Sequence, residues 1–189
     1  FSARGDFLRK WGSDGEGDGQ FNAPLGIALG RQGNVYVLDS QNDRVQVFNS
    51  GGEFLTKWRV GTVPGLSEGP KGIAVDASGN VYLTEQGGRL ELYSASGEFL
   101  RTLGDFGSGD GQFLVPLGVA VDAFLNVYVL DAGNGRVQVF SARGDFLRKW
   151  GSVGIGDGQF TFPWGIAVGE EGNVYVAGTL NNQVQVFSP

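Results

Sequence analysis

The sequence of 189 residues contains no cysteine, no histidine and no methionine. The lack of cysteine excludes a disulfide framework and a thiol nucleophile. The lack of histidine excludes a Ser-His-Asp triad and the commonest zinc sites. No apolar run approaches the roughly 18 residues of a membrane-spanning helix, and the chain does not open on a signal-peptide pattern. We therefore expect a soluble protein, whose cellular location the sequence does not reveal.

Positive charge is also scarce. The chain has 14 Lys and Arg against 20 Asp and Glu, a net charge of -6. Such a surface repels phosphate backbones and anionic lipid, which argues against nucleic acid or a membrane as the partner. Glycine, by contrast, is abundant at 34 residues, and 41% of the chain is hydrophobic. This composition predicts a folded protein with many tight turns rather than a disordered or collagen-like chain.

The glycines belong to a fourfold repeat. A Pro-x-Gly motif followed by an apolar-Ala-apolar run recurs every 46 or 47 residues, at Pro24, Pro70, Pro116 and Pro163. Asn-Val-Tyr recurs in the same register, at Asn34, Asn80, Asn126 and Asn173. An alternating apolar motif ends each unit, at Val45–Phe48, Leu90–Tyr93, Val137–Phe140 and Val184–Phe187. Three motifs in register over four copies show that the whole chain is built of one repeated unit.

Each unit contains four short runs that are typical of β-strands. In the first unit these are Phe7–Trp11, Gly26–Leu29, Asn34–Asp39 and Arg44–Phe48. Four antiparallel strands in a repeat of roughly 40–50 residues predict a blade of a β-propeller. We therefore predict an all-β fold and a single domain over 1–189 with four four-stranded blades. The predicted units are an outer strand at 1–13 and blades at 14–58, 59–103, 104–150 and 151–189.

The motifs resemble the NHL-repeat propellers along the whole chain. The third unit carries the pattern most fully, with Pro116, Gly118, Asp122, Asn126-Val127-Tyr128, Asp131, Asn134 and Arg136-Val137-Gln138-Val139-Phe140. The second unit departs from it at 85–89, the third at the apolar pair Phe124-Leu125, and the fourth at 178–183. The resemblance implies a propeller with no particular activity, here a fragment or an engineered form of a longer NHL-like protein.

The two ends of the sequence predict how the ring closes. Residues 1–13 and 140–152 are identical, and the offset of 139 equals three whole repeats. The chain begins with an outer-strand sequence and ends on the third strand of a blade. We therefore predict a Velcro closure in which segment 6–11 completes the last blade, as NHL-like and other propellers do.

The sequence leaves open whether that closure occurs within one chain or between two. Four blades are the tight extreme for a propeller, whereas an open four-bladed arc would expose two large apolar faces. Two chains could bury those faces as a homodimer that completes an eight-bladed ring. We favour this dimer slightly over a closed monomer.

A group of polar residues recurs where the second strand of each unit turns into the third. It comprises Asp39, Asn42 and Arg44 in the first unit, Glu85 and Arg89 in the second, and Asp131, Asn134 and Arg136 in the third. A ring of acids suggests a cation site. However, carboxylate, amide and guanidinium groups at this spacing can satisfy one another and nearby backbone groups. We therefore predict a structural turn network, with no metal, no cofactor and no catalytic residue.

One rim of the propeller is the predicted binding surface. Trp164 stands where other units have Leu or Lys71, and the neighbouring Phe162 replaces Ala23 of the first unit. Aromatic side chains on a rim can stack on a ligand or anchor a partner. Equally, these two can cover the degenerate turn of the fourth unit. The predicted rim residues are thus Trp164, Phe162 and Lys71.

Three functions follow from these observations. The first is a non-catalytic scaffold that self-assembles or binds a protein or small ligand at one rim. The second is a propeller enzyme of the lactonase or lyase type with an axial metal, against which the apolar inner strands argue. The third is RNA recognition, against which the negative net charge argues.

Overall fold

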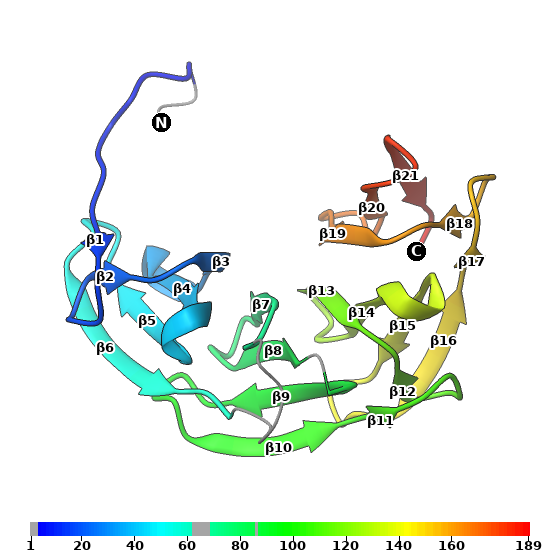
Figure 1. The fold of residues 1–189 in the computed structure, drawn as a ribbon, viewed down its shortest axis with the longest axis horizontal. Helices are drawn as coiled ribbons and strands as arrows, with labels where there is room; N and C mark the ends of the chain where they lie inside the picture. The colour runs from blue at the N-terminus through cyan, green and yellow to red at the C-terminus, as the bar shows by residue number, and fades with distance from the viewer. Residues whose placement is uncertain (1–3, 62–68, 86) are drawn as a thin grey trace.

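The structure is a computed structural model that describes residues 4–61, 69–85 and 87–189. Its strands form four antiparallel sheets, stacked side by side as the blades of a propeller around an inner edge (Figure 1). Three of these sheets have four strands and the last has three. The predicted all-β propeller with four blades is confirmed.

Each blade runs from an inner strand to an outer strand in chain order. Blade 1 consists of β3 (Pro24–Leu29), β4 (Val35–Asp39), β5 (Arg44–Phe48) and β6 (Phe54–Arg59). Blade 2 consists of β7 (Gly72–Val75), β8 (Val81–Glu85), β9 (Arg89–Tyr93) and β10 (Phe99–Leu103). Blade 3 consists of β13 (Pro116–Val121), β14 (Val127–Asp131), β15 (Arg136–Phe140) and β16 (Phe146–Trp150). Blade 4 consists of β19 (Pro163–Val168), β20 (Val174–Gly178) and β21 (Gln183–Phe187).

Short elements connect the blades and shape the turns. Parallel two-residue pairs join β1 (Ser13–Asp14) to β2 (Gln20–Phe21), β11 (Asp105–Phe106) to β12 (Gln112–Phe113), and β17 (Ser152–Val153) to β18 (Gln159–Phe160). Each pair brackets a glycine-rich crossing segment, at 15–21, 107–113 and 154–160. Single 3-10 turns occur at η1 (Arg31–Gly33), η2 (Ser40–Asn42) and η3 (Ala132–Asn134).

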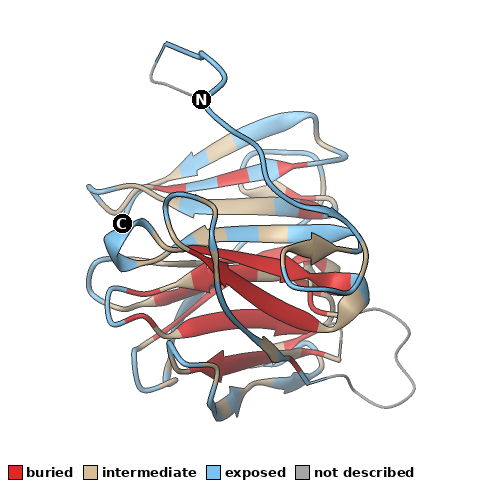
Figure 2. Cartoon of the chain, turned by 90° about the vertical axis from the view of Figure 1, so that its left-hand side faces the viewer, coloured by how far each residue is buried: buried red, intermediate tan, exposed pale blue. Residues whose placement is uncertain are grey.

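The middle strands of the inner blades are buried along their whole length. Every residue of β8, β14 and β15 is buried, as is every residue of β4 and β5 in blade 1, whereas the residues of the outer strands β6, β10 and β16 are exposed or half-buried (Figure 2). A middle strand has another blade against each face, so both of its faces need apolar side chains. This explains why these runs are almost continuously apolar.

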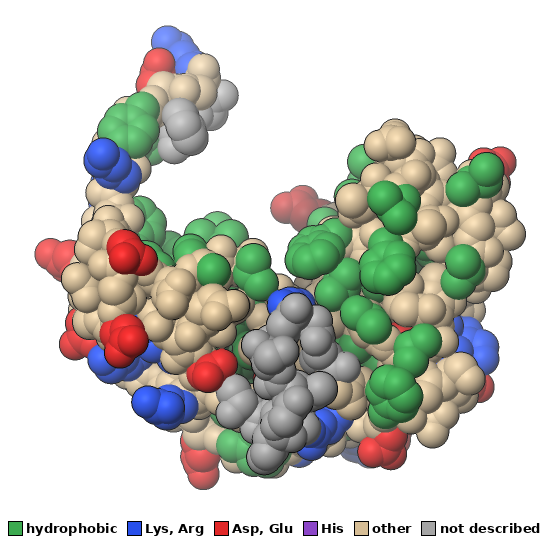
Figure 3. Space-filling model, in the orientation of Figure 1, with side chains coloured by type: hydrophobic (Ala, Val, Ile, Leu, Met, Phe, Trp, Pro, Cys, Tyr) green, Lys and Arg blue, Asp and Glu red, His purple; other side chains and the backbone are tan. Residues whose placement is uncertain are grey.

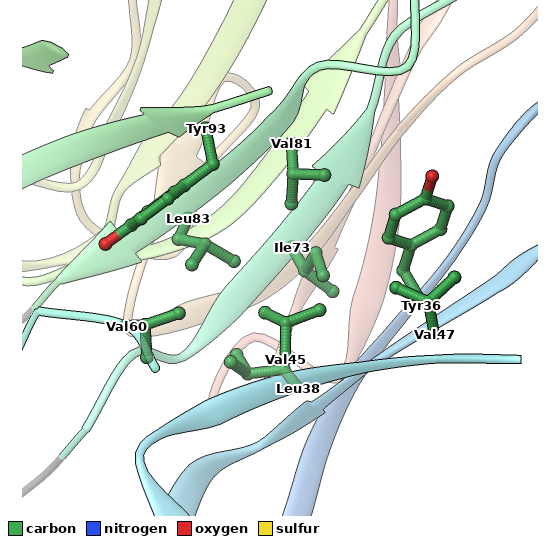
Figure 4. Close-up of a cluster of buried hydrophobic side chains, with 9 residues drawn as sticks. All are labelled: Tyr36, Leu38, Val45, Val47, Val60, Ile73, Val81, Leu83 and Tyr93. Atoms are coloured by element: carbon green, nitrogen blue, oxygen red, sulfur yellow. The ribbon is translucent and has the colours of Figure 1, made fainter. Parts of the chain in front are cut away.

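Most of the hydrophobic core lies between blades, and a smaller cluster on the free face of blade 1 comprises Val35, Val37 and Phe48 with Phe21 and Phe54. Between blades 1 and 2 the core contains nine buried residues from both sheets: Tyr36, Leu38, Val45, Val47, Val60, Ile73, Val81, Leu83 and Tyr93 (Figure 4). Equivalent clusters join blade 2 to blade 3 and blade 3 to blade 4. Because the apolar area of a single sheet is buried only against its neighbour, each blade depends on the next for stability.

A side chain at or next to the end of each outer strand packs on the following blade. Trp58, next to the end of β6, lies against Gly97 in the outer hairpin of blade 2, where a Cβ would clash with the indole. Trp150, at the end of β16, stacks on Phe187 of blade 4 with ring centroids 5.7 Å apart. Aromatic rings thus cover the junctions of blades 1 and 2 and of blades 3 and 4, whereas Leu103 of β10 lies against Gly144 at the junction of blades 2 and 3.

The four blades form an open arc, and the predicted Velcro closure is not made within the chain. Segment 6–11 forms no strand, and β21 has no outer partner among the residues that the structure describes. Figure 1 shows the reason: blade 4 stands across a wide opening from blade 1, because four successive blade-to-blade rotations do not return the chain to its start. The fourth blade therefore has three strands instead of the predicted four.

Candidate functional site

In blade 3 a buried carboxylate, Asp131, ties the end of β14 to the start of β15. Its Oδ2 accepts hydrogen bonds from Nε of Arg136 and Nδ2 of Asn134, both at 2.8 Å. Its Oδ1 accepts one from the backbone N–H of Leu114 at 2.8 Å. Asp131 is fully buried and Arg136 almost so. The charge of each is thus compensated by charge-assisted hydrogen bonds away from water.

The cationic part of this cluster holds the crossing segment 107–113 on blade 3. The guanidinium group of Arg136 donates hydrogen bonds of 2.7–2.9 Å to the carbonyl oxygens of Ser108, Gly109 and Gln112. Gln138 completes the attachment, since its Oε1 accepts from the N–H of Gly111 at 3.0 Å. All these polar groups have partners, so the cluster fastens a loop to a sheet.

Blade 1 contains the same arrangement. Asp39 Oδ2 accepts from Nε of Arg44 at 2.7 Å and from Nδ2 of Asn42 at 2.9 Å. Arg44 in turn donates to carbonyl oxygens of the crossing segment 15–21. The structure therefore brings together the six predicted turn residues of blades 1 and 3 and surrounds them with backbone acceptors.

Blade 2 lacks this network. Glu85 and Arg89 lie opposite each other in the β8–β9 ladder, but no hydrogen bond joins their side chains among the described residues. The turn is one residue shorter than in blade 3, and the connection 60–71 has no Gly-Asp-Gly-Gln-Phe segment. Among the residues that the structure describes, Arg89 has no hydrogen bonds to backbone carbonyl oxygens like those that Arg136 makes in blade 3.

Glu85 is instead a buried acid in an unfavourable environment. It is 1% exposed, and its Oε1 has no hydrogen-bond partner. Burial raises the pKa of Glu85 to about 8, with repulsion from Glu91 adding to the rise and the charge of Arg89 opposing it. Glu91 itself accepts a hydrogen bond from the hydroxyl of Tyr93 at 2.6 Å. Burial and this bond raise the pKa of Tyr93.

Blade 4 rebuilds part of the network from a different side chain. Gly178 occupies the position of Asp131, and Gln183 that of Arg136. Asn181 takes over the missing role: its Oδ1 accepts from the N–H of Thr161 at 2.8 Å, and its Nδ2 donates to Gly154 at 3.0 Å. One amide thereby fastens both ends of the crossing segment 154–160 without any buried charge.

This end of blade 4 carries an exposed apolar patch, which we define as Phe162, Trp164 and Leu180. Each of the three side chains is at least half exposed. The N–H of Leu180 donates to the carbonyl oxygen of Thr161 at 3.4 Å, which sets the β20–β21 turn beside the segment before β19. Phe162 has a left-handed backbone, with φ of 46°, which is uncommon for a bulky residue. The sequence reasoning missed Leu180, although other blades have Gln41 and Gly133 at that position.

The other predicted or discussed positions lie apart from the patch. Lys71 is half-buried at the equivalent position of blade 2, and the intervening Leu117 of blade 3 is buried. Phe124 is 85% exposed at the tip of the β13–β14 hairpin. The three rim residues predicted from the sequence therefore do not form one continuous surface.

Charged side chains outside the networks show no further cluster of ligands. Among residues 4–61, 69–85 and 87–189, no group of three acidic side chains is placed to hold a metal ion. A hollow of about 490 Å³ in blade 1 is lined by polar residues, among them Asn42, Asp43 and Lys57. In the part of the chain that the structure describes, no helix is long and apolar enough to cross a bilayer.

Comparison with known proteins identifies the repeat. The blades and their order define the class as a β-propeller. The sequence profile of the NHL repeat matches residues 21–48, 113–140 and 160–187, which lie in blades 1, 3 and 4. The chain is therefore a β-propeller that contains NHL repeats in three of its four blades. The three matched segments are those whose blades keep the glycine-rich crossing segment.

Curated relatives share parts of these repeats. Protein lin-41 of Caenorhabditis elegans is 41% identical over 56 residues, which are 30% of this chain and 5% of that protein. NHL repeat-containing protein 3 of Homo sapiens is 41% identical over 56 residues, which are 28% of this chain and 16% of that protein. The chain thus spans a small part of the length of these relatives.

Solved structures share the fold at low identity. A structural genomics protein of unknown function from Bacteroides thetaiotaomicron matches with a TM-score of 0.71 and 16% identity, over 87% of this chain and 47% of that one. A streptogramin B lyase matches with a TM-score of 0.65 and 15% identity, over 88% and 54%. A catalytically inactive virginiamycin B lyase from Staphylococcus aureus with quinupristin matches at 0.61 and 14%, over 88% and 55%. This chain corresponds to about half of each of these chains.

Proposed function

We propose that this chain is a non-catalytic scaffold that binds a partner protein through the apolar patch of blade 4. The observation that carries the proposal is the exposure of Phe162, Trp164 and Leu180 on two segments that a backbone hydrogen bond between Leu180 and Thr161 holds together at one blade end. Rigid aromatic side chains that project from a fixed scaffold are typical anchors of protein interfaces. The patch lies on strands and a tight turn, so little conformational entropy is lost on binding.

The charged groups of the same blade ends support a structural rather than a chemical role. In blades 1 and 3 the carboxylate oxygens are occupied by arginine, asparagine, glutamine and backbone donors. In blade 4 the equivalent acid is replaced by Gly178. A partner would therefore meet apolar side chains at this end, and a satisfied network beneath them.

Selection of peptides from a random library displayed on phage tests the proposal. Peptides selected on this protein should bind Trp164→Ala and Leu180→Ala at least tenfold more weakly, because each substitution removes part of the apolar contact. Phe124→Ala is the matched control, since it removes an aromatic side chain of equal or greater exposure from another blade. Selected peptides that bind Trp164→Ala as tightly as the original protein would refute the patch as the binding surface.

A lyase with an axial metal is the second candidate function, because two of the similar structures are lyases. One of them was made catalytically inactive by a histidine-to-alanine substitution, and this chain contains no histidine. The inner strands also carry apolar residues, such as the Gly-Ile-Ala runs at 26–28 and 165–167. We expect no turnover of a streptogramin B antibiotic with added divalent cations. Turnover that depends on the cation would overturn the scaffold assignment.

A further inference from the structure

Segment 7–11 already lies on blade 1 in the way that an outer strand lies on the following blade. The ring of Trp11 is 5.9 Å from that of Phe48 at 49°, and the ring of Trp150 is 5.7 Å from that of Phe187 at 48°. Both pairs are related by the 139-residue offset of the identical sequences. Segment 7–11 therefore occupies the place of the outer strand of a blade that would precede blade 1.

A hydrogen bond supports this placement. Arg9 Nη1 donates to the carbonyl oxygen of Ser50 at 3.2 Å, in the outer hairpin of blade 1. Arg101 of β10 makes the equivalent bond to Ala142 in the outer hairpin of blade 3, at 2.8 Å. The contact that an outer strand makes with the next blade is thus present for the segment, although its own blade is missing.

In the described part of the chain, the outer edge of blade 4, at β21, lacks the fourth strand that the other three blades have. Residues 184–187 have the same sequence, Val-Gln-Val-Phe, as residues 137–140 of β15, and residues 7–11 have the same sequence as β16. In blade 3 these two sequences pair, with Val137 opposite Trp150 and Val139 opposite Arg148. The same register would place Val184 opposite Trp11 and Val186 opposite Arg9. An edge strand and a strand that fits it are therefore present in one chain, on opposite sides of the opening.

The faces that border the opening are apolar and match in the same way. On blade 4, Val184 and Val186 are 64% and 56% exposed, whereas the equivalent Val137 and Val139 of blade 3 are 0% and 1% exposed. On blade 1 the inner-strand residues Ile27 and Leu29 are 67% and 70% exposed, while the middle strands of the same face are already covered by Phe21 and Phe54. Figure 3 shows hydrophobic side chains gathered along the inside of the arc on both arms. Every other face of this kind is buried against the next blade.

Charged side chains on the two sides of the opening also complement each other. Within a blade, the outer-strand lysine pairs with the aspartate of the crossing segment, as in Lys57 with Asp18 and Lys149 with Asp110. By the repeat offset, Lys10 corresponds to Lys149 and Asp157 to Asp110. Neither Lys10 nor Asp157 has an ion pair among the residues that the structure describes. Across the opening each would be the partner of the other.

We propose that a second copy of this chain fills the opening, and that two arcs related by a two-fold axis form an eight-bladed ring. Segment 7–11 of each copy becomes the fourth strand of blade 4 of the other, and blade 1 of each copy covers blade 4 of the other. A second copy fits better than closure on itself, because the two edges stand across the opening from each other (Figure 1). The arc also corresponds to about half of single chains that share this fold, 47–55% of their length.

The first test is the mass in solution, measured by light scattering over a range of concentrations. We expect the mass of two chains, twice the 20.0 kDa of one. The mass of one chain at every concentration would overturn the proposal, and so would open-ended assemblies of growing mass. This measurement is independent of the peptide test of the rim patch, since a ring that binds no peptide would still have the mass of two chains.

The second test fixes the register of the exchanged strand with a disulfide. The chain has no cysteine, so Arg9→Cys with Val186→Cys introduces one defined pair. On oxidation we expect a covalent dimer on a denaturing gel, because these residues would lie opposite each other in the antiparallel ladder. The control is Lys10→Cys with Val186→Cys, which puts the two thiols on opposite faces of the strands and should cross-link at least tenfold less. A disulfide-linked monomer, or equal cross-linking of both pairs, would refute the exchange.

The third test breaks the apolar contact. Val186→Glu places a charge in the buried face, and we expect dimer dissociation to become on the order of 100-fold easier or more. Phe124→Glu adds the same charge at the exposed hairpin tip of blade 3 and should leave the mass unchanged. Circular dichroism of the separated Val186→Glu chains would check that the blades remain folded. An unchanged dimer for Val186→Glu contradicts the proposed interface.

Discussion

Blades 2 and 3 have equivalent cores, but the turn between the second and third strands is held by different interactions in the two blades. In blade 3, Asp131 and Arg136 form a fully partnered, buried ion pair that fastens the crossing segment 107–113. In blade 2 there is no such crossing segment, and Glu85 keeps a buried oxygen without a partner. Both blades nevertheless have four strands and the same order. The comparison teaches that the network secures a loop, while the sheet depends on the apolar faces.

Blade 2 holds its connection to the neighbouring blades by hydroxyl groups. Ser40 Oγ donates to the carbonyl oxygen of Pro70 at 2.9 Å, and Thr84 Oγ1 donates to that of Leu117 at 2.6 Å. These bonds are neutral, so they avoid the desolvation of buried charges. Blade 2 is also the blade that the NHL profile does not match.

The largest expected effect is the loss of the buried carboxylate in blade 3. Asp131→Asn keeps the shape of the side chain but leaves Arg136 without its counter-ion, and should lower the free energy of unfolding by about 3 kcal/mol. Urea denaturation at pH 8 measures it. Glu85→Gln at the same pH is the matched control in blade 2, where no loss is expected. Equal losses for both substitutions would show that the two turns are energetically equivalent.

The charge of Glu85 is expected to destabilise the fold, in contrast to that of Asp131. The effect on the free energy of unfolding is smaller and depends on pH. The folded-state pKa of about 8 lies above the ordinary 4.5, so the folded protein binds a proton more tightly than the unfolded chain. Below about pH 4.5 the Glu85 carboxyl is protonated in both states and does not lower the free energy of unfolding. Its destabilising effect grows as the pH rises from about 4.5 to 8 and is constant at higher pH.

Glu85→Gln removes this cost. We expect it to stabilise the protein on the order of 1–2 kcal/mol at pH 9 and to have almost no effect at pH 4.5. Urea titrations at the two pH values give the difference. A gain that is the same at both pH values would mean that the Glu85 carboxyl does not titrate in this range.

The smallest effect concerns the geometry of the guanidinium group. Arg136→Lys retains the charge but cannot reach three carbonyl oxygens and Asp131 together, so it should cost about 1 kcal/mol. Arg89→Lys should cost nothing measurable, since Arg89 lacks these acceptors. The shift of the thermal midpoint measures both. A comparable shift for Arg89→Lys would indicate that blade 2 uses its arginine after all.

The repeat made the blade pattern predictable, because strand period, turn residues and spacing all recur in register. The network of blade 3 was predictable for the same reason, since Asp131, Asn134 and Arg136 lie at a spacing that lets them meet across one turn. The absence of such a network around Glu85 was harder to predict. It depends on the crossing segment, which is distant in the sequence and supplies the acceptors for Arg136 in blade 3.

The sequence left the choice between an open arc and a closed ring undecided, with only a slight preference for the open form. The choice depends on a small rotation at each blade junction, and small inner-strand residues such as Gly26 and Ala28 occur for any number of blades. The rotation is set by the packing of whole side chains between sheets, as at Trp150 of blade 3 and Phe187 of blade 4, whose rings are 5.7 Å apart. Leu180 could have been predicted as part of the patch, because the equivalent turn positions of blades 1 and 3 hold Gln41 and Gly133.

Because outer-strand tryptophans pack on the next blade, the intrinsic fluorescence of the protein reports on the junctions between blades. Trp58 lies at the junction of blades 1 and 2, and Trp150 at that of blades 3 and 4. The junction of blades 2 and 3 has Leu103 at this position and therefore gives no fluorescence signal of its own. Trp11 reports on the start of the arc and Trp164 on the rim patch. Variants that each retain one indole would therefore let fluorescence follow the separation of the blades junction by junction, without any added label.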